Sequence, residues 1–343
     1  MALCFAARAQ QLEWTFPLDA PGSAATLYPS ETDPTGIVVS AAKQVVLLDG
    51  KGAAVWKYEL PNHAASPATV ANLDGEGDPE ITVITLDANL ISLDSNGQKR
   101  WELPFAMPSG GFKHIVAADV VASPGLELLI GFDDGWLNCI GADGTLLWHF
   151  FGDKGRVGGV AVGDVDADGA AEIVYSTDNG HVYCLTAEGR VEWRYDELAP
   201  YGRSGPNIAD VNNDGKSEVY VTRSNVGNAT CIMALDAANG AFLWRSKDIQ
   251  QGYVSNAFAD LDGDGKQEIL HGDKGNFLYC ENADGTRRWQ AELGGRGLFW
   301  APAVADVDGD GALEIVAGMR GMDANGTSVF VVDADGKVEA TIK

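Results

Sequence analysis

The chain has 343 residues, of which 45% are hydrophobic and 9% aromatic, so it can bury a packed core and is not intrinsically disordered. Asp and Glu number 49 against 24 Lys and Arg, and the formal net charge of −25 excludes nucleic acid as a default partner, because binding a polyanion requires a cationic surface. No run of about 18 apolar residues occurs, so we expect no membrane insertion, and we predict a soluble monomer.

The first residues resemble the end of a secretory signal. Residues 1–9 contain a short apolar stretch followed by Ala7-Arg8-Ala9, a small-x-small pattern typical of a cleavage site. We interpret residues 1–9 as a signal-peptide remnant and residues 10–343 as a single domain, and an ordinary N-terminus is the alternative. The first interpretation predicts a secreted, periplasmic or cell-surface protein.

An internal repeat dominates the rest of the chain. Six acidic segments begin at Asn72, Asp119, Asp164, Asp210, Asp260 and Asp306, at intervals of 47, 45, 46, 50 and 46 residues. One period further back, near residue 26, the flanking strands recur without the acidic loop and complete seven repeats. Each repeat reads as four short strands separated by the acidic loop and two turns. This pattern predicts an all-β fold, a seven-bladed β-propeller of four-stranded antiparallel blades.

Tryptophans end the first six repeats, at Trp56, Trp101, Trp148, Trp193, Trp244 and Trp289. The seventh repeat has Ala340 at this place, whereas Trp14 stands near the N-terminus. We therefore predict that an N-terminal strand around Trp14 joins the seventh blade and closes the propeller, and that the tryptophans pack between blades without a chemical role. Equivalent strand positions hold Cys139, Cys184 and Cys280, which are too far apart for disulfides and are predicted to be buried thiols.

These elements resemble two known kinds of propeller repeat. The acidic loops are similar to FG-GAP/VCBS repeats, the calcium-binding propeller repeats that also occur in integrin α-subunit heads. The turn-and-tryptophan elements, such as ADGTLLWHF, resemble the tryptophan-docking motif of pyrroloquinoline-quinone-like propellers. The resemblance covers nearly all of residues 22–343. It implies the fold and calcium, but it implies little about function because propellers host many unrelated activities.

The acidic loops have the composition of a calcium site. In the loop from Asp164 to Glu172, carboxylates at positions 1, 3, 5 and 9 can converge with the carbonyl of position 7, and Gly169 at position 6 permits the sharp turn. Hard oxygen donors in a flexible loop suit Ca²⁺ better than Mg²⁺. The last Glu falls at position 9 between strands, which excludes an EF-hand. Solvated acidic turns without metal are the alternative.

Five loops keep this ligand set, and we predict about four or five structural Ca²⁺ ions, each joining the first strand of a blade to its second. The third repeat (Asp119, Val121, Ser123, Glu127) has lost two ligands and is predicted to be empty, and the Asn72 loop departs most among the five. The predicted ligands are Asn72, Asp74, Glu76 and Glu80; Asp164, Asp166, Asp168, Ala170 and Glu172; Asp210, Asn212, Asp214, Lys216 and Glu218; Asp260, Asp262, Asp264, Lys266 and Glu268; and Asp306, Asp308, Asp310, Ala312 and Glu314.

The face opposite the acidic loops is the predicted ligand face. Cationic, imidazole and aromatic residues precede the acidic loops and are predicted to line a central funnel, where aromatic rings would stack on sugars and cations would pair with uronate or sulfate groups. For each residue alone, ordinary loop packing is the alternative. The candidates are Lys113, His114, Arg156, Arg203, Tyr253 and Trp300.

Two classes of function remain open. The first is a calcium-binding module without enzymatic activity, whose ligand is a glycan, for example an acidic polysaccharide, or a protein. The alternative is a polysaccharide lyase acting on an acidic, uronate-containing glycan. Its catalytic candidates are His114, Tyr253, Arg156 and Arg203, which would abstract the proton α to a carboxylate and stabilise the anion. A quinone dehydrogenase is disfavoured because the chain has no adjacent cysteine pair.

Overall fold

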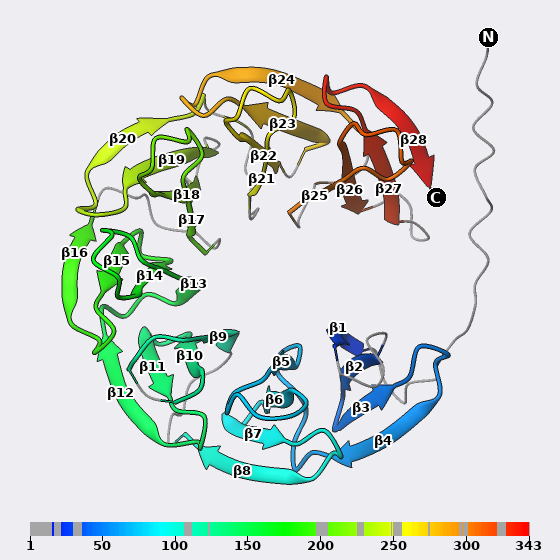
Figure 1. Cartoon of the computed structure of the whole chain (residues 1–343), viewed down its shortest axis with the longest axis vertical. Helices are drawn as coiled ribbons and strands as arrows, with labels where there is room; N and C mark the ends of the chain where they lie inside the picture. Colours follow the sequence, from blue (N-terminus) through cyan, green and yellow to red (C-terminus); the bar gives the residue numbers. More distant parts are fainter. Residues whose placement is uncertain are drawn as a thin grey trace. The chain divides into compact units, whose positions relative to one another are not determined.

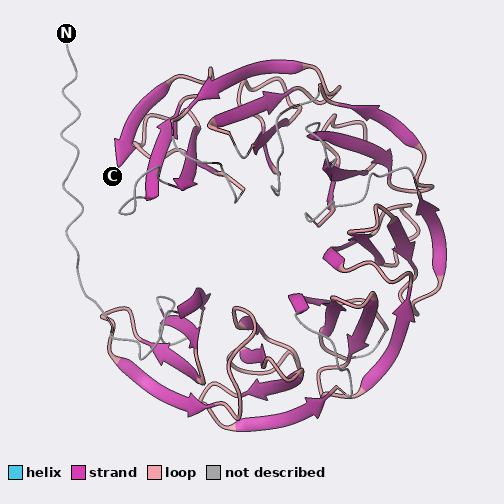
Figure 2. Ribbon diagram, turned by 180° about the vertical axis from the view of Figure 1, so that it is seen from behind, coloured by secondary structure: helices cyan, strands magenta, loops and turns pink. Residues whose placement is uncertain are grey.

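The computed structural model describes residues 16, 22–29, 36–105, 112–122, 124–196, 205–224, 230–247, 249, 256–273, 275–294, 297, 301–320 and 327–342. These residues form 28 β-strands and no helix (Figure 2). Accordingly, this part of the chain has no helix long and apolar enough to span a membrane. The strands pair into seven four-stranded antiparallel sheets, each built from consecutive strands, which is the predicted seven-bladed β-propeller.

The chain divides into two compact units, Met1–Phe112 with Pro124–Leu126 and Gly141–Thr145, and the remainder. The first unit holds two sheets, in which β1 lies against β5. The first sheet comprises β1 (Gly22–Tyr28), β2 (Gly36–Ala41), β3 (Gln44–Leu48) and β4 (Ala54–Glu59), and the second comprises β5 (Thr69–Ala71), β6 (Glu80–Ile84), β7 (Asn89–Leu93) and β8 (Lys99–Pro104).

The second unit holds the strands of the other five sheets, except Phe112 at the start of the third sheet. Figure 1 shows the fourth strands of these sheets on the outer side of the unit. The third sheet comprises β9 (Phe112–Ala118), β10 (Glu127–Phe132), β11 (Trp136–Ile140) and β12 (Leu146–Phe151), and the fourth β13 (Val157–Gly163), β14 (Glu172–Thr177), β15 (Val182–Leu185) and β16 (Val191–Tyr195). The fifth comprises β17 (Asn207–Ala209), β18 (Glu218–Ser224), β19 (Thr230–Asp236) and β20 (Phe242–Arg245), the sixth β21 (Ala257–Ala259), β22 (Glu268–Gly272), β23 (Phe277–Glu281) and β24 (Arg287–Glu292), and the seventh β25 (Ala303–Ala305), β26 (Glu314–Arg320), β27 (Thr327–Val332) and β28 (Val338–Ile342).

Strand position within a sheet determines the sequence pattern. Every residue of β10 and β14, the second strands of their sheets, is buried, whereas β12 and β8 at the outer edge alternate between exposed and half-buried residues. A strand covered on both faces needs a continuous apolar run, and an edge strand with one solvated face needs alternation. The core therefore lies on the second and third strands of each sheet.

The tryptophans pack between consecutive sheets, as predicted. Each of the six indoles covers the turn glycine of the following sheet: a Cβ on Gly189, for example, would lie 2.8 Å from Cε3 of Trp148. The indole Nε1 of Trp148 also donates a hydrogen bond to the carbonyl oxygen of Ala187 in that turn, at 2.8 Å. The same bond recurs for Trp56, Trp101, Trp193 and Trp289.

The seventh sheet has four strands from its own repeat, and Ala340 occupies the tryptophan position of β28, opposite Val331. The predicted closing strand around Trp14 lies outside the described residues, as do residues 1–9. Phe16 is described, and its ring lies 5.3 Å from Lys57 Nζ on β4. Cys139, Cys184 and Cys280 are buried free thiols, as predicted, and Cys231 is a fourth.

Candidate metal centres

A buried glutamate begins the second strand of every sheet that has an acidic segment. These residues are Glu80, Glu127, Glu172, Glu218, Glu268 and Glu314, and all are at most 5% exposed. In each, Oε2 accepts a hydrogen bond from the backbone N–H of the residue seven positions earlier, for example Val165 N to Glu172 at 2.9 Å and Val307 N to Glu314 at 2.8 Å. The same bond forms at the other four. This bond fixes one oxygen of each glutamate at the base of the loop.

In four loops the aspartate at position 1 accepts a hydrogen bond from the backbone N–H of the glycine at position 6. The amide N–H of Gly169 donates to Asp164 Oδ2 at 3.0 Å, and Gly311 donates to Asp306 Oδ2 at 3.0 Å. Equivalent bonds join Gly215 to Asp210 and Gly265 to Asp260. Gly169 has a φ of +90°, a conformation that residues with a Cβ rarely adopt, which explains the glycine at position 6.

Three loops gather their carboxylates into triads. In each, the residues at positions 1, 3 and 9 offer oxygens that lie within 4.8 Å of one another. The triads are Asp164, Asp166 and Glu172; Asp260, Asp262 and Glu268; and Asp306, Asp308 and Glu314. Three of the five predicted ligand sets are thus brought together at positions 1, 3 and 9.

The residues at positions 5 and 7 are hydrogen-bonded to each other and do not belong to the triads. Asp168, Asp264 and Asp310 lie outside the groups of oxygens within 4.8 Å. Instead, their Oδ1 atoms accept the backbone N–H of position 7, at Ala170, Lys266 and Ala312 respectively, at 2.8 Å. Lys216 makes the same bond to Asp214 at 2.9 Å. Ligation by these aspartates and by the carbonyl groups of position 7 stays a prediction.

The two loops that contain asparagine have an unsatisfied oxygen instead of a triad. Asn212 donates through Nδ2 to Glu218 Oε1 at 3.1 Å, and Asn72 donates through Nδ2 to the carbonyl oxygen of Gly77 at 3.0 Å. The Oδ1 atoms of both are buried and have no hydrogen-bond donor within the described part of the chain. A buried acceptor without a partner is costly, and a cation would satisfy it. In the third repeat, by contrast, Glu127 accepts bonds from both Val120 and Val121.

The donor set fits a hard cation. All the side-chain donors are oxygens, the ligand type that Ca²⁺ prefers. Burial raises the pKa of Glu172, and the neighbouring Asp166 and Asp168 raise it further. Burial likewise raises the pKa of Glu218 and of Glu268. A divalent cation at these loops would relieve the same repulsion.

Two of the acidic loops form ion pairs with an arginine of the fourth strand, a contact that sequence reasoning missed. Arg100 forms ion pairs with Asp74, at 2.7 Å, and with Glu80. Arg288 forms ion pairs with Asp262 at 2.5 Å and with Glu268 at 3.5 Å. The hydrogen bond from Arg288 holds the pKa of Asp262 below its usual range. The only signal in the sequence is that each arginine directly precedes a docking tryptophan.

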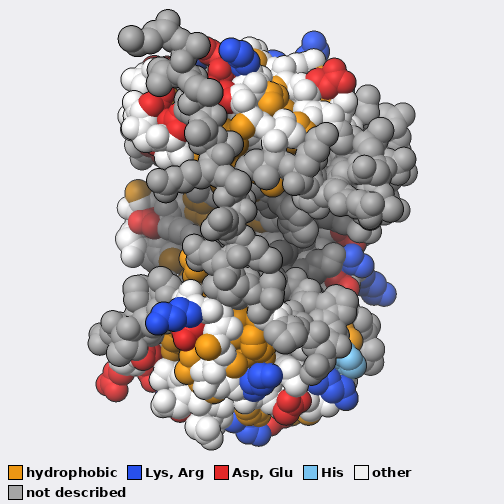
Figure 3. Space-filling view, turned by 90° about the vertical axis from the view of Figure 1, so that its right-hand side faces the viewer, with side chains coloured by type: hydrophobic (Ala, Val, Ile, Leu, Met, Phe, Trp, Pro, Cys, Tyr) orange, Lys and Arg blue, Asp and Glu red, His pale blue; other side chains and the backbone are white. Residues whose placement is uncertain are grey.

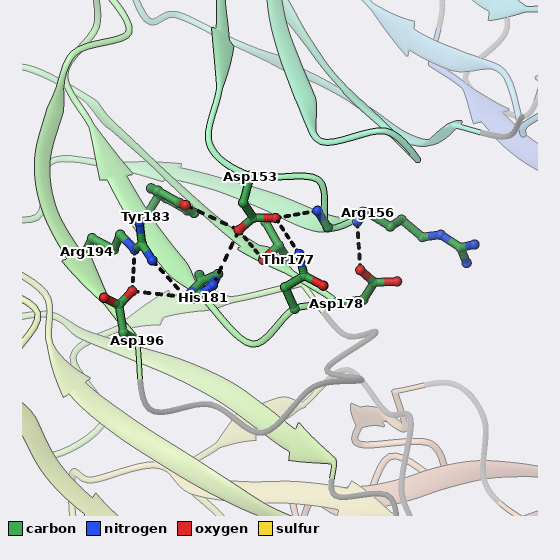
Figure 4. Close-up of polar contacts among 10 residues, drawn as sticks. Asp153, Arg156, Thr177, Asp178, His181, Tyr183, Arg194 and Asp196 are labelled. Carbon is green, nitrogen blue, oxygen red and sulfur yellow. Dashed lines mark hydrogen bonds and ion pairs between the residues drawn. The ribbon is translucent and has the colours of Figure 1, made fainter. Parts of the chain in front are cut away.

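Of the predicted ligand face, the structure describes the side chain of Arg156 (Figure 4). Its backbone N–H donates to Asp178 Oδ1 at 2.7 Å, and its Nε pairs with Asp133 at 2.7 Å, while the side chain stays 29% exposed. Lys113 and His114 belong to β9, but their side chains are not described. Arg203, Tyr253 and Trp300 lie outside the described residues, so the funnel stays a prediction.

Beside Arg156, a polar network fixes the connection between β12 and β13. Asp153 Oδ2 accepts hydrogen bonds from Thr177 at 3.1 Å and from Tyr183 at 3.2 Å (Figure 4). His181 Nδ1 lies 3.0 Å from Asp196, which also pairs with Arg194. These hydrogen bonds and ion pairs hold the loop that positions Arg156.

A pocket of about 470 Å³ lies between the acidic loops of the fifth and sixth sheets. Its lining includes Asn212, Glu218, Asp262, Glu268 and Leu243. On the face drawn in Figure 3, acidic and basic side chains are interspersed.

Comparison with known sequence families gives two matches to different parts of the chain. Residues 210–271 and 260–317 match the FG-GAP-like repeat. Residues 2–127 match the family described as outer membrane protein assembly factor BamB. No curated protein matches the sequence significantly. The two matches support a propeller repeat protein.

Solved structures give the same fold. BamB from Moraxella catarrhalis has a TM-score of 0.61 at 18% identity, over 96% of this chain and 86% of that chain. Sqt1 from Saccharomyces cerevisiae has a TM-score of 0.70 at 12% identity, over 93% of this chain and 84% of that chain. Sqt1 from Chaetomium thermophilum, bound to the N-terminus of the ribosomal protein L10, has a TM-score of 0.66 at 11% identity, over 94% and 87%. Identities this low show the fold alone.

Proposed function

We propose that this protein is a calcium-stabilised β-propeller that binds a protein ligand. The observation that carries the calcium part is the pair of triads at Asp164 and Asp306. In each, a buried glutamate and two aspartates offer one oxygen apiece, and these three oxygens lie within 4.8 Å of one another. Like charges this close repel each other, and Ca²⁺ would turn that repulsion into coordination.

The ions have a structural role in this proposal. Each acidic loop connects the first strand of a sheet to the second, so a cation bound by positions 1, 3 and 9 joins the end of one strand to the start of the next. About four or five ions would occupy the loops at Asn72, Asp164, Asp210, Asp260 and Asp306. Because all of these ligands are used to hold the loop, we assign the ions no catalytic step.

A protein is the ligand class that the comparisons favour. The family that matches residues 2–127 is described as an assembly factor for outer membrane proteins, and one similar propeller was solved with a peptide segment bound. By the same reasoning we propose a location outside the cytoplasm. A glycan ligand and the lyase remain alternatives without a described site, because Arg156 is the one catalytic candidate whose side chain the structure describes.

Calorimetric titration with calcium tests the metal sites directly. Asp164→Asn removes one charge from a triad, so the variant should bind one fewer tight Ca²⁺ ion than the parent protein. Asp119→Asn is the matched control, since it changes the equivalent position of the third repeat, where the ligands of positions 3 and 5 are missing, and it should leave the stoichiometry unchanged. Equal stoichiometry in all three proteins would overturn the calcium assignment.

Selection from a displayed random-peptide library, beside a panel of immobilised acidic polysaccharides, tests the ligand class. We expect peptides to be enriched on the calcium-loaded protein, and Arg156→Ala to weaken their binding by about tenfold, a typical effect of losing one charged contact. Arg190→Ala is the control, because Arg190 is 71% exposed and lies in the turn before β16. Binding to the polysaccharides alone, with release of an unsaturated uronate, would favour the lyase instead.

A further inference from the structure

All seven sheets share one irregularity between the third and fourth strands. The pairing shifts there so that one residue of the fourth strand, directly before the tryptophan position, has no partner on the third. Such a β-bulge changes the direction in which a side chain points. The bulged residues, in sheet order, are Val55, Arg100, Leu147, Glu192, Leu243, Arg288 and Glu339.

In two sheets the bulged side chain forms ion pairs with the acidic loop of its own sheet. In the second sheet it is Arg100, paired with Asp74 and Glu80, and in the sixth it is Arg288, paired with Asp262 and Glu268. In both cases the guanidinium contacts position 3 and position 9 of the loop. These are two of the three positions that form the triads.

The fourth and seventh sheets carry the opposite charge at the bulge. In the fourth sheet the unpaired residue is Glu192, between Val191 and Trp193. In the seventh sheet it is Glu339, between Val338 and Ala340. A glutamate at this place adds negative charge to the loop, whereas an arginine removes it.

We propose that the bulged residue determines how strongly each acidic loop binds calcium, with Arg100 and Arg288 acting as built-in counter-ions. This inference rests on the proposed calcium function. The loops at Asp164 and Asp306, beside Glu192 and Glu339, are the tight sites. The loops at Asn72 and Asp260 have part of their negative charge neutralised by an arginine and bind calcium weakly. The loop at Asp210, beside the uncharged Leu243, is intermediate.

Electrostatics sets the expected size of the difference. To use Asp262 and Glu268 as ligands, Ca²⁺ must displace Arg288 or share these carboxylates with a like charge a few ångströms away. Unit charges about 4 Å apart near a protein surface interact strongly enough that we expect calcium to bind the Asp260 loop about 100-fold more weakly than the Asp164 loop.

The test exchanges the bulged residues and measures calcium affinity by calorimetry, with melting in EDTA as a second readout. Arg288→Leu, which introduces the uncharged residue of the fifth sheet, should tighten one site by about tenfold, because it removes about half of the charge difference between the Asp260 and Asp164 loops. In EDTA the same variant should melt below the parent protein, because the counter-ion is lost, and calcium should restore its melting temperature. Glu192→Arg should weaken one tight site by about 100-fold. Leu147→Arg in the third sheet is the control and should change no calcium site.

The outcomes separate this inference from the function on which it rests. If Asp164→Asn removes a tight site but Arg288→Leu and Glu192→Arg leave all affinities unchanged, calcium binding stands and the role of the bulge is wrong. If the parent protein binds no calcium, both are wrong. Because Glu192→Arg tests the same idea in a different sheet, a folding defect in Arg288→Leu would not prevent the decision.

Discussion

Chelation of calcium should lower the melting temperature by about 10–20 °C, at a few °C per kcal/mol for a chain of this size. The two carboxylate triads without a counter-arginine, at Asp164 and Asp306, dominate this effect. A ligand that binds only the folded state at 100 times its dissociation constant stabilises that state by about 2.7 kcal/mol, so two such ions contribute about 5 kcal/mol. Differential scanning calorimetry in calcium and in EDTA measures the difference.

The double variant Asp164→Asn, Asp306→Asn should lose most of this calcium-dependent shift. Asp119→Asn should keep it, because it alters an acidic segment whose Glu127 is already satisfied by two backbone N–H groups. Magnesium should restore less stability than calcium, since Mg²⁺ requires a tighter octahedral site. A melting temperature that is the same in EDTA and in calcium would contradict the prediction.

Arg287→Leu should destabilise the sixth sheet by about 3–5 kcal/mol, the usual effect of leaving one partner of a buried ion pair without the other. Glu281 is fully buried and pairs with Arg287 at 2.8 Å, and His271 Nε2 lies 3.2 Å from the same oxygen. Asp273, also fully buried, accepts a hydrogen bond from Tyr279 at 2.8 Å beside them. Denaturation by urea at neutral pH measures the loss.

Arg194→Leu is the matched control. Arg194 lies over the ring of Tyr183 at 5.3 Å, as Arg287 lies over the ring of Tyr279 at 4.3 Å. Its ion-pair partner Asp196 is exposed, so an effect below about 1 kcal/mol is expected, as for surface ion pairs in general. An equally small loss in Arg287→Leu would show that Glu281 does not depend on the arginine.

The pH dependence of the free energy of unfolding tests the role of His271 beside Glu281 and Arg287. Burial lowers the pKa of His271, and Arg287 lowers it further, although Glu281 raises it. The folded protein therefore keeps His271 neutral, whereas the unfolded chain takes up a proton below about pH 6.5, so the free energy of unfolding should fall as pH drops below this value. In Arg287→Leu the protonated histidine can replace the missing charge, and the difference from the parent protein should shrink between pH 7.5 and 5.5. A constant difference would contradict this role.

The sequence predicts the sheets well because each repeat states the same pattern independently. Seven periods of similar length, the turn glycines and the tryptophans agree on four strands per repeat, and the structure has these strands. The acidic loops are predicted for a similar reason, since positions 1, 3 and 9 are held by local hydrogen bonds between residues at most seven apart, such as Val165 to Glu172. The sequence is sufficient to predict strands and loops whose hydrogen bonds join residues close together in the chain.

Features that depend on side-chain direction across strands are not predicted. Arg288 lies 26 residues after Asp262 in the sequence, and only the bulge between β23 and β24 directs it to that loop. Likewise, nothing local distinguishes Glu281 in β23 from an exposed glutamate, although it is fully buried beside His271 and Arg287. The sequence predicts that the tryptophans pack between blades, but only the structure shows that each indole contacts the turn glycine of the following sheet.

Under the proposed role of the bulge, each repeat that keeps the acidic ligand set has a heritable ion requirement. Because the acidic loop and the bulged residue belong to the same sheet, duplication or loss of one repeat would carry both together, and the number of ions the fold demands would change with it. A single substitution at this position would instead convert a repeat from self-sufficient to ion-dependent without altering its strands. A lineage living where calcium is scarce could therefore keep the architecture by changing one codon per repeat.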